Sequence, residues 1–470
     1  MKAEIGLIGL GVMGANLALN IAEKGFRIAV YNRTPAVTDA FMASAGKLAH
    51  HIIPCKTYAE LVEAIEKPRP VIVLVKAGEA VDEQITHLRE LMDADDIIID
   101  SGNANFRDTI RRDAALKDSG LRFIGMGISG GEEGARHGPA IMVGGPEASY
   151  KRVEKVLTAI AAKFKKDPCC AWMGPDGAGH FVKMIHNGIE YADMQMIAEV
   201  YGIMRDGLRM SADETGKTFA KWNKGKLDSY LIEITSKVLQ KTDEATGKPL
   251  VDMILDKAGQ KGTGKWSVIE AQELAVPASA IEAAVAARVL SSMKDQRVAA
   301  QELYGKRQSR LSPASKAAYL RQCESALYAA KICAYAQGFA MLQAASNTYK
   351  WNLPMGQIAK IWRAGCIIRS QFLDVIASTF AKRKGIQNLL ATPEFVAMVQ
   401  ADQKALRRTV ADAALAGLPI PALSAALAYF DSYRQARGTA NLIQAQRDFF
   451  GAHTFERIDG PGSHHVEWES

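Results

Sequence analysis

The sequence contains few cysteines, and none of them are paired in the spacing that binds zinc. Six cysteines stand at positions 55, 169, 170, 323, 333 and 366 of a 470-residue chain, without a CxxC motif. A disulfide-stabilised secreted domain has far more cysteines per residue, and a structural zinc site needs closely spaced ligands. We therefore expect free, mostly buried thiols in a reducing compartment and no metal site.

Long runs of like charge and long apolar runs without polar residues are also missing. Lys and Arg exceed Asp and Glu by 58 to 51, and no block of five or six like charges occurs. Such a small excess suits an anionic small substrate and gives no specific support for nucleic-acid binding. The uncharged segment 5–22 contains four glycines and two asparagines, so it predicts neither a membrane span nor a signal peptide. We expect a cytoplasmic protein without membrane or nucleic-acid partners.

The chain divides into a part in which strands and helices alternate, a helical part and a tail. Strands predicted at residues 3–8, 27–31, 71–75, 97–100 and 141–143 alternate with helical segments, the first of them over Asn16–Lys24 and closed by Gly25. This order predicts a parallel, doubly wound sheet in an α/β domain over 1–177. Ala-, Leu- and Met-rich segments with a 3.6-residue period predict a large all-α domain over 178–435. The aromatic tail, 436–470, is expected to pack on something, such as another subunit.

A glycine motif marks a dinucleotide site. Residues 9–14 read Gly9-Leu10-Gly11-Val12-Met13-Gly14, a G-x-G-x-x-G motif. It follows a predicted strand and opens a helix, which is the context that distinguishes a Rossmann-like site from an ordinary glycine turn. The glycines let the backbone approach a pyrophosphate, and the helix N-terminus donates N–H groups to it.

The residues after the second strand indicate which dinucleotide binds. Asn32-Arg33-Thr34 stands where an NAD site usually has a carboxylate for the ribose 2′-hydroxyl. Arg33 can pair with a 2′-phosphate and Thr34 can donate a hydrogen bond to it, which favours NADP. If Arg33 only begins a loop, the choice of cofactor stays open.

Further polar residues follow other strands of the predicted sheet. Val75-Lys76-Ala77 ends one strand and Asn103 follows the next, so Lys76 and Asn103 are placed to contact cofactor or substrate. Either residue is alternatively a simple loop residue. A second glycine-rich loop, Ser129-Gly130-Gly131, offers N–H groups and a hydroxyl for a carboxylate or a substrate hydroxyl.

One predicted helix carries an unusual polar stripe. Lys183, His186, Asn187 and Glu190 are spaced i, i+3, i+4 and i+7, which puts them on one face of a helix that is otherwise apolar. The alternative is a solvated face with a Lys183/Asn187 pair. However, a base, an imidazole, an amide and an acid together are a catalytic assortment. Lys183 and Glu190 would lie about 10 Å apart along the axis and could act on different carbons of one substrate.

The segment 259–265 nearly spells a phosphate-binding Walker A motif. Trp266 occupies the position of the magnesium-binding Ser or Thr, and residues 252–258 before it look helical, so we reject a P-loop ATPase. The loop could still bind a phosphate monoester through Lys261 and Thr263. Arg288 and Arg447 with His453 are further cationic candidates, although Arg288 alone reads as a helix surface charge.

Together these motifs resemble the 6-phosphogluconate dehydrogenases, within the β-hydroxyacid dehydrogenase superfamily. The resemblance spans the chain. Its motifs are residues 9–14, 32–34, 75–77, 128–135, 183–191, 261–266 and 447–453. The chain has Ser101 where the family often has Gly and Ala140 where the family often has Ser. Residues 462–468 follow the family pattern only loosely.

The resemblance implies oxidative decarboxylation of 6-phospho-D-gluconate to D-ribulose 5-phosphate, CO2 and NADPH, in the pentose phosphate pathway. It implies Lys183 as general base and Glu190 as general acid, so the pKa of Lys183 should be lowered and that of Glu190 raised. Family roles in substrate binding fall on Asn103, Ser129, Gly130, Gly131, His186, Asn187, Tyr191, Lys261, Thr263 and Arg288, joined by Arg447 and His453 from the partner subunit of a homodimer.

Two other functions remain open on the residues alone. A dehydrogenase for an unphosphorylated β-hydroxy acid would have no use for Lys261, Arg288, Arg447 and His453. A catalytically silent NADP-binding protein would not need Lys183 and Glu190.

Overall fold

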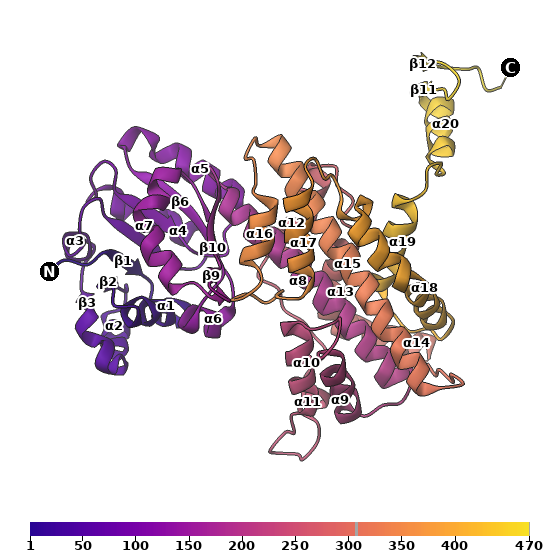
Figure 1. Ribbon diagram of the computed structural model, residues 1–470, viewed down its shortest axis with the longest axis horizontal. Coiled ribbons are helices and arrows are strands. Elements are labelled where there is room, and N and C mark those ends of the chain that lie inside the picture. Colours follow the sequence, from indigo (N-terminus) through magenta and orange to yellow (C-terminus); the bar gives the residue numbers. More distant parts are fainter. Residues whose placement is uncertain (306–308, 470) are drawn as a thin grey trace.

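The computed structural model describes residues 1–305 and 309–469. The chain forms a sheet-containing half, a helical half and a small C-terminal extension (Figure 1). The first half consists of β1 (Ile5–Ile8), α1 (Val12–Glu23), β2 (Ile28–Tyr31), α2 (Pro35–Ser44), η1 (Gly46–His51), β3 (Ile52–Cys55), α3 (Tyr58–Glu63), β4 (Pro70–Val73), α4 (Glu79–Arg89), β5 (Ile97–Asp100), α5 (Phe106–Leu116), η2 (Lys117–Ser119), β6 (Arg122–Ile128), α6 (Gly131–His137), β7 (Ile141–Gly144), α7 (Glu147–Ile160), β8 (Lys163–Phe164), β9 (Asp167–Pro168) and β10 (Cys170–Gly174).

The eight-stranded sheet has the order β10-β7-β6-β5-β4-β1-β2-β3. The strands from β3 to β6 are parallel, and every residue of β1, β2, β4 and β5 is buried, as expected for strands covered by helices on both faces. The doubly wound prediction is therefore confirmed.

The prediction of an entirely parallel sheet is wrong at one edge. β7 runs antiparallel to β6, and β10 runs parallel to β7. The chain between β6 and β7 is residues 129–140, with the short helix α6 inside it. β7 therefore starts at the end of the sheet where β6 stops, and the segment does not cross to the other end.

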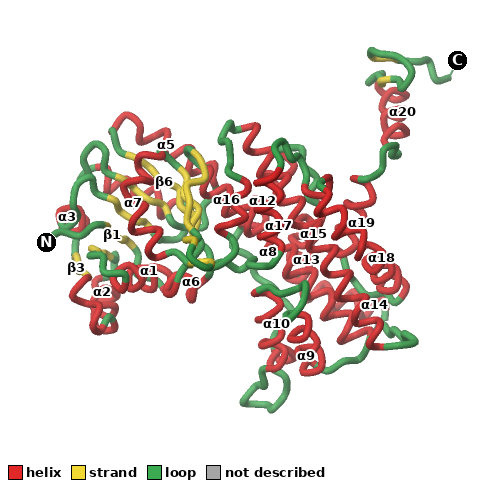
Figure 2. Tube along the Cα trace, in the orientation of Figure 1, coloured by secondary structure: helices red, strands yellow, loops and turns green. Residues whose placement is uncertain are grey.

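The second half is helical, as predicted. It consists of α8 (Ala178–Gly202), the π-helical turn η3 (Ile203–Gly207), α9 (Ala212–Trp222), α10 (Tyr230–Gln240), α11 (Leu250–Met253), α12 (Thr263–Glu273), α13 (Ser279–Ser292), α14 (Lys294–Tyr304), α15 (Lys316–Thr348), α16 (Met355–Ile361), α17 (Phe372–Lys382), η4 (Leu389–Ala391), α18 (Pro393–Leu415) and α19 (Pro421–Tyr433). Figure 2 shows these helices side by side, with strands confined to the other half and the extension.

Helix α8 joins the two halves. Its first turns pack on β6 and β7, and its remaining length packs on α12, α13 and α15. A side chain at Gly179 would put a Cβ 2.4 Å from the carbonyl oxygen of Gly125 in β6, so glycine is what allows the helix to lie directly on the sheet. Consequently the polar stripe of α8 is in the interior of the molecule.

Two helix predictions need correction. α1 begins at Val12 and not at Asn16, because the glycine motif itself forms its first turn. The predicted helix over 252–258 is wrong beyond Met253, where α11 ends, and residues 254–258 are not helical. Asp256 instead forms ion pairs with Lys294 and Arg297 at the start of α14, and these hold the segment in an open loop.

The C-terminal extension is ordered by its own contacts. α20 (Ala440–Gly451) and the two-stranded pair β11 (Phe455–Glu456) and β12 (Ser463–His464) project from the end of α19 (Figure 1). Their centre is the buried carboxylate of Asp448, which lies 2.9 Å from Nδ1 of His465 and accepts hydrogen bonds from Nε1 of Trp468 and the backbone N–H of Thr454. The outer face keeps Leu442, Ile443 and Phe450 exposed.

All six cysteines are unpaired and buried, which confirms the expectation of free thiols. Within 1–305 and 309–469, no helix combines the length and the apolar character that crossing a bilayer requires.

A fully buried ion pair connects α8 to α15. Nζ of Lys331 lies 3.0 Å from Oδ1 of Asp193, and both side chains are essentially inaccessible. We predict that Lys331→Met destabilises the protein by about 3–5 kcal/mol, because it leaves an uncompensated buried carboxylate. Calorimetric unfolding should therefore show a large drop in Tm.

The double variant Lys331→Met/Asp193→Leu should recover much of that loss, because it removes both charges together. A double variant no more stable than Lys331→Met would contradict the account.

Candidate active site

The glycine motif forms a tight loop between β1 and α1. Gly9 has φ +101°, and a Cβ there would lie 2.4 Å from the carbonyl oxygen of Leu74. A Cβ on Gly14 would lie 1.8 Å from the carbonyl oxygen of Gly9, so neither position accepts a larger residue without a backbone shift. The N-terminus of α1 starts at exposed Gly11 and Val12 without a side-chain cap. Its N–H groups are thus free to bind an anion.

This loop borders a cleft of about 660 Å3. The cleft extends along the carboxyl ends of the parallel strands to the loop before α12. Its lining residues are Gly11, Val12, Met13, Gly14, Leu74, Val75, Lys76, Ala77, Ser101, Gly102, Asn103, Ile128, Lys261 and Trp266. The cleft therefore brings eight of the predicted cofactor residues together with Lys261 of the helical half, whereas Gly9, Leu10, Asn32, Arg33 and Thr34 are not among its lining residues.

Asn32 and Arg33, in the loop after β2, have different surroundings. Oδ1 of Asn32 accepts a hydrogen bond from the backbone N–H of Leu10, 3.1 Å away, and its amide donates to the carbonyl oxygen of Thr34. Asn32 thus holds the glycine loop in place. Arg33 and Thr34 are exposed, and in the described part of the chain no hydrogen bond or ion pair occupies the Arg33 guanidinium. Arg33 is available for a ligand.

The polar stripe of α8 meets the loop after β6. Nζ of Lys183 donates a hydrogen bond to Oδ1 of Asn187 at 2.6 Å and lies 3.4 Å from Oγ of Ser129. The Ser129 hydroxyl is also 3.2 Å from Nε2 of His186. All four side chains are buried, so the Lys183/Asn187 pair exists, but in the interior and not on a solvated face.

The stripe continues to α12 and α13. The amide of Asn187 donates to Oγ1 of Thr263, the first residue of α12, at 3.1 Å. The guanidinium of Arg288 in α13 stacks over the ring of Tyr191, 3.8 Å from its centroid, which is a cation–π contact. The predicted phosphate-binding residues Tyr191, Thr263 and Arg288 therefore adjoin the stripe.

Burial shifts the pKa values of the ionisable residues in the stripe. Desolvation lowers the pKa of Lys183 and places that of His186 well below its usual value. Desolvation raises the pKa of Glu190, against the opposing effects of Lys183 and Arg288. Oε2 of Glu190 lies 3.8 Å from Nδ1 of His186. The two shifts have the directions that a lysine base and a carboxylic acid would need.

The glycines after Ser129 shape the same region. Gly130 has φ +106°, and a Cβ there would meet the carbonyl oxygen of Gly365 at 2.6 Å. Gly131 has φ +61° and opens α6 with its surface exposed. The loop thus places backbone N–H groups close to Ser129, and these groups could hold a substrate carboxylate.

The predicted tail residues do not reach this region within one chain. Arg447 is exposed and donates to Oε1 of Gln444 in its own helix, and exposed His453 packs against Phe450. α20 lies at the far side of the helical half from the sheet (Figure 1). Any contribution of Arg447 and His453 has to come from another copy of the chain.

Several lining residues escaped the sequence interpretation. Ile128 and Trp266 lie in motifs of the resemblance and Ser101 departs from the family pattern, but none of them was assigned to the site, and Leu74 and Gly102 have no distinctive pattern. Trp362 packs its ring edge-on against His186, with centroids 5.5 Å apart. Nothing in the sequence near position 362 indicates that contact.

Comparison with known proteins identifies the family. The NAD binding domain of 6-phosphogluconate dehydrogenase matches residues 4–174, and the C-terminal domain of 6-phosphogluconate dehydrogenase matches residues 179–468. The chain is 50% identical over 468 residues to an NADP(+)-dependent, decarboxylating 6-phosphogluconate dehydrogenase of Bacillus subtilis, covering 99% of both chains. It is 47% identical over 468 residues to an NAD(+)-dependent, decarboxylating relative from the same organism, covering 100% of both.

A solved structure agrees along the whole length. The Plasmodium falciparum 6-phosphogluconate dehydrogenase, described in its apo form and with NADP+ or 6-phosphogluconate, superimposes with a TM-score of 0.96 at 43% identity. The superposition covers 99% of this chain and 100% of that one. The two family models, the full-length relatives and this structure together show that the chain belongs to the 6-phosphogluconate dehydrogenase family.

Proposed function

We propose that this protein oxidises and decarboxylates 6-phospho-D-gluconate to D-ribulose 5-phosphate, CO2 and NADPH in the pentose phosphate pathway. The observation that carries the proposal is the buried amine of Lys183, hydrogen-bonded to Asn187 and close to Ser129, whose chain neighbour Ile128 lines the cleft that starts at the dinucleotide loop. A silent NADP-binding protein would have no use for a desolvated lysine there. A dehydrogenase for an unphosphorylated acid would have no use for the cations Lys261 and Arg288.

The residues present fit NADP. The Gly9–Gly14 loop and the uncapped N-terminus of α1 would hold the pyrophosphate, and Arg33 with Thr34 would bind the 2′-phosphate. The relatives include both NADP- and NAD-dependent enzymes at similar identity, so overall similarity does not select the cofactor. The exposed, unengaged guanidinium of Arg33 is what favours NADP. When bound, NADP supplies the acceptor for a hydride from C3 of the substrate.

Lys183 acts first as a base. Burial lowers its pKa, which favours the neutral amine that can take the proton of the substrate 3-hydroxyl. The oxidised substrate is a β-keto acid, in which the C1–C2 bond breaks readily and releases CO2. The lysine, now an ammonium, stabilises the negative charge that develops on the C3 oxygen.

Glu190 completes the reaction. The raised pKa of this carboxyl keeps it protonated to higher pH than usual. It protonates the enediol carbon that was C2 of the substrate and becomes C1 of the ketose. Ser129, Gly130, Gly131, Asn103, His186 and Asn187 hold the substrate carboxylate and hydroxyls. Tyr191, Lys261, Thr263 and Arg288 bind the phosphate.

The tail completes the site of a second subunit. Arg447 and His453 are exposed on an extension with an apolar face that the single chain leaves uncovered. In a homodimer, residues 436–470 of one subunit would pack on the other and add both cationic groups to its phosphate site. The preceding domains would be 1–177 for the cofactor and 178–435 for substrate and dimer contacts. Six unpaired, buried thiols favour a cytoplasmic location.

The base is tested by substitution and pH. Lys183→Met should reduce kcat by about 10²–10⁴-fold, the usual contribution of general acid–base catalysis. Because the neutral amine is the active form, wild-type activity should fall as the pH drops through the lowered pKa of Lys183. Activity should also fall at high pH as Glu190 loses its proton, and Glu190→Gln should remove that alkaline limb. Absorbance of reduced nicotinamide measures both.

The control is Lys151→Met, which removes an exposed lysine from α7 and should leave kcat unchanged. Full activity of Lys183→Met would refute the assigned base.

Arg33 is tested by cofactor choice. Arg33→Met should lower kcat/KM for NADP by about 10–100-fold, because it removes a charge-assisted contact of about 1.5–3 kcal/mol, and should leave kcat/KM for NAD little changed. The matched control, Arg89→Met, removes an exposed arginine from α4. If the wild-type enzyme prefers NAD, the proposed reaction still stands, but the proposed role of Arg33 is refuted.

The exchanged tail is tested by subunit mixing. Lys183→Met and Arg447→Ala chains are each expected to be weakly active, but a mixed dimer pairs one intact body with one intact tail. Refolding equal amounts together should restore about a quarter of wild-type activity, since half of the dimers are mixed and each has one complete site. Activity no higher than the mean of the two parents would exclude the exchange.

A further inference from the structure

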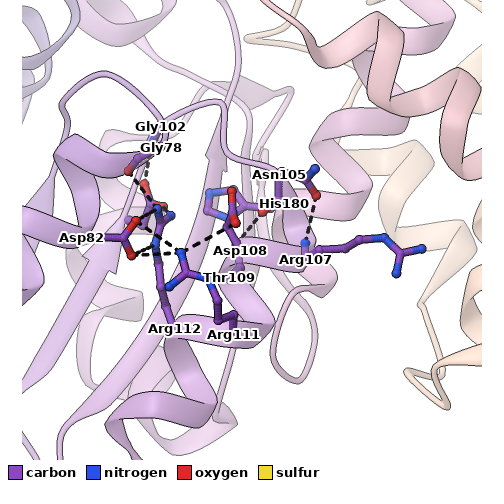
Figure 3. A network of polar contacts seen from close by, with 11 residues as sticks. Gly78, Asp82, Gly102, Asn105, Arg107, Asp108, Thr109, Arg111, Arg112 and His180 are labelled. Carbon is purple, nitrogen blue, oxygen red and sulfur yellow. Dashed lines mark hydrogen bonds and ion pairs between the residues drawn. The ribbon is translucent and has the colours of Figure 1, made fainter.

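A buried arginine links the two loops that form the middle of the cofactor cleft. Arg112 lies on α5 with its side chain 2% exposed. Its Nη2 donates to the carbonyl oxygen of Gly78, and Nε and Nη2 donate to the carboxylate of Asp82 at 2.9 and 2.8 Å. Nη1 donates to Oδ2 of the fully buried Asp100 at 3.2 Å. Figure 3 shows Arg112 with Asp82, close to the Gly78 and Gly102 turns.

The partners of Arg112 are the ends of elements that reach the cleft. Gly78 directly follows the cleft residues Val75, Lys76 and Ala77 and caps α4. Asp100 ends β5, and its Oδ1 accepts a hydrogen bond from the backbone N–H of Gly102 at 3.0 Å, which holds the turn Ser101–Asn103. One planar guanidinium therefore fixes the spacing of two loops that a ligand would contact.

The same network reaches the helix that carries Lys183. Thr109, one turn before Arg112 on α5, has its hydroxyl 2.7 Å from Nδ1 of His180, one turn before Lys183 on α8 (Figure 3). His180 is buried and its other ring nitrogen has no partner among the described residues. Through adjacent turns, α5 thus contacts both the cofactor loops, by Arg112, and the helix of the polar stripe, by Thr109.

Strand order shows which part of the dinucleotide these loops serve. Along the sheet, β2 with Arg33 is followed by β1 with the glycine loop, then β4, then β5. A 2′-phosphate at Arg33 and a pyrophosphate at the glycine loop place the adenine half over β2 and β1. The other half, with the nicotinamide, then lies over the loops after β4 and β5.

On this geometry, and resting on the proposed NADP-dependent function, we propose that Arg112 is a positioning residue for the nicotinamide half of the cofactor. It contacts no ligand itself. It holds the Lys76–Gly78 and Ser101–Asn103 loops at the separation that this half requires.

The test compares two ligands in binding titrations of the purified full-length protein. NADP occupies both halves of the cleft, whereas adenosine 2′,5′-bisphosphate occupies only the adenine half. Arg112→Met should weaken NADP binding by about tenfold or more, since small displacements of positioning groups have large effects. It should leave the Kd of the bisphosphate unchanged. In turnover, KM for NADP should rise.

Arg111→Met is the matched control. Arg111 is the neighbouring arginine and also binds Asp82, but it is 57% exposed and has no contact with Gly78 or Asp100. It should change neither Kd. Arg112→Lys keeps the charge without the fork and should lose NADP affinity as Arg112→Met does.

Equal weakening of both ligands would show a general structural role and overturn the proposal, as would an unchanged NADP affinity in a folded Arg112→Met protein. Should Arg112→Met not fold, Asp82→Asn decides, because this half-exposed carboxylate is a partner of Arg112. It must selectively weaken NADP binding for the proposal to stand. A wild-type protein that binds NADP but leaves 6-phosphogluconate unchanged would refute the proposed reaction, while the two-ligand comparison still decides the role of Arg112.

Discussion

The burial of the Lys183 amine is the constraint on which the rest of the structure depends. An ammonium in the interior is costly unless it is paired or gives up its proton. Here the nearest partners are an amide oxygen and a hydroxyl, from Asn187 and Ser129, and no carboxylate forms an ion pair with it in the part of the chain that the structure describes. The fold must therefore hold α8 tightly against the sheet, and the glycine contact between Gly179 and Gly125 achieves this.

The antiparallel edge of the sheet serves the same site. Because β7 turns back beside β6, the segment between them stays at the carboxyl end of the sheet. Ser129 thereby reaches both Lys183 and His186. A long crossover to a parallel strand would have taken the chain away from this edge after Ile128. The departure from a regular doubly wound sheet is thus part of how the site is built.

Local patterns in the sequence were sufficient to predict most helices and strands and the polar residues on one face of α8. The Gly9–Gly14 loop, the buried strands and the Lys183–Glu190 stripe follow from spacing alone, since each depends on neighbours in the chain. The direction of β7 and the loop at 254–258 depend on contacts between distant segments, such as Asp256 with Arg297. Trp266 and Arg112 were not identifiable for the same reason. Their roles come from where α12 and α5 lie.

The balance between Lys183 and Glu190 shows why both must be enclosed. Their mutual attraction favours the ionised pair, raising the pKa of the lysine and lowering that of the acid, whereas desolvation favours the neutral pair. Desolvation prevails because His186 and Asn187 occupy the turn between them, and because Lys183 is almost inaccessible while Glu190 retains only part of its exposure. Opening the site to water would weaken both pKa shifts and so favour the ammonium and the carboxylate, which can serve neither as base nor as acid. In this family member the enclosure formed by α8, the sheet edge and α12 is therefore itself a determinant of the proposed proton transfers.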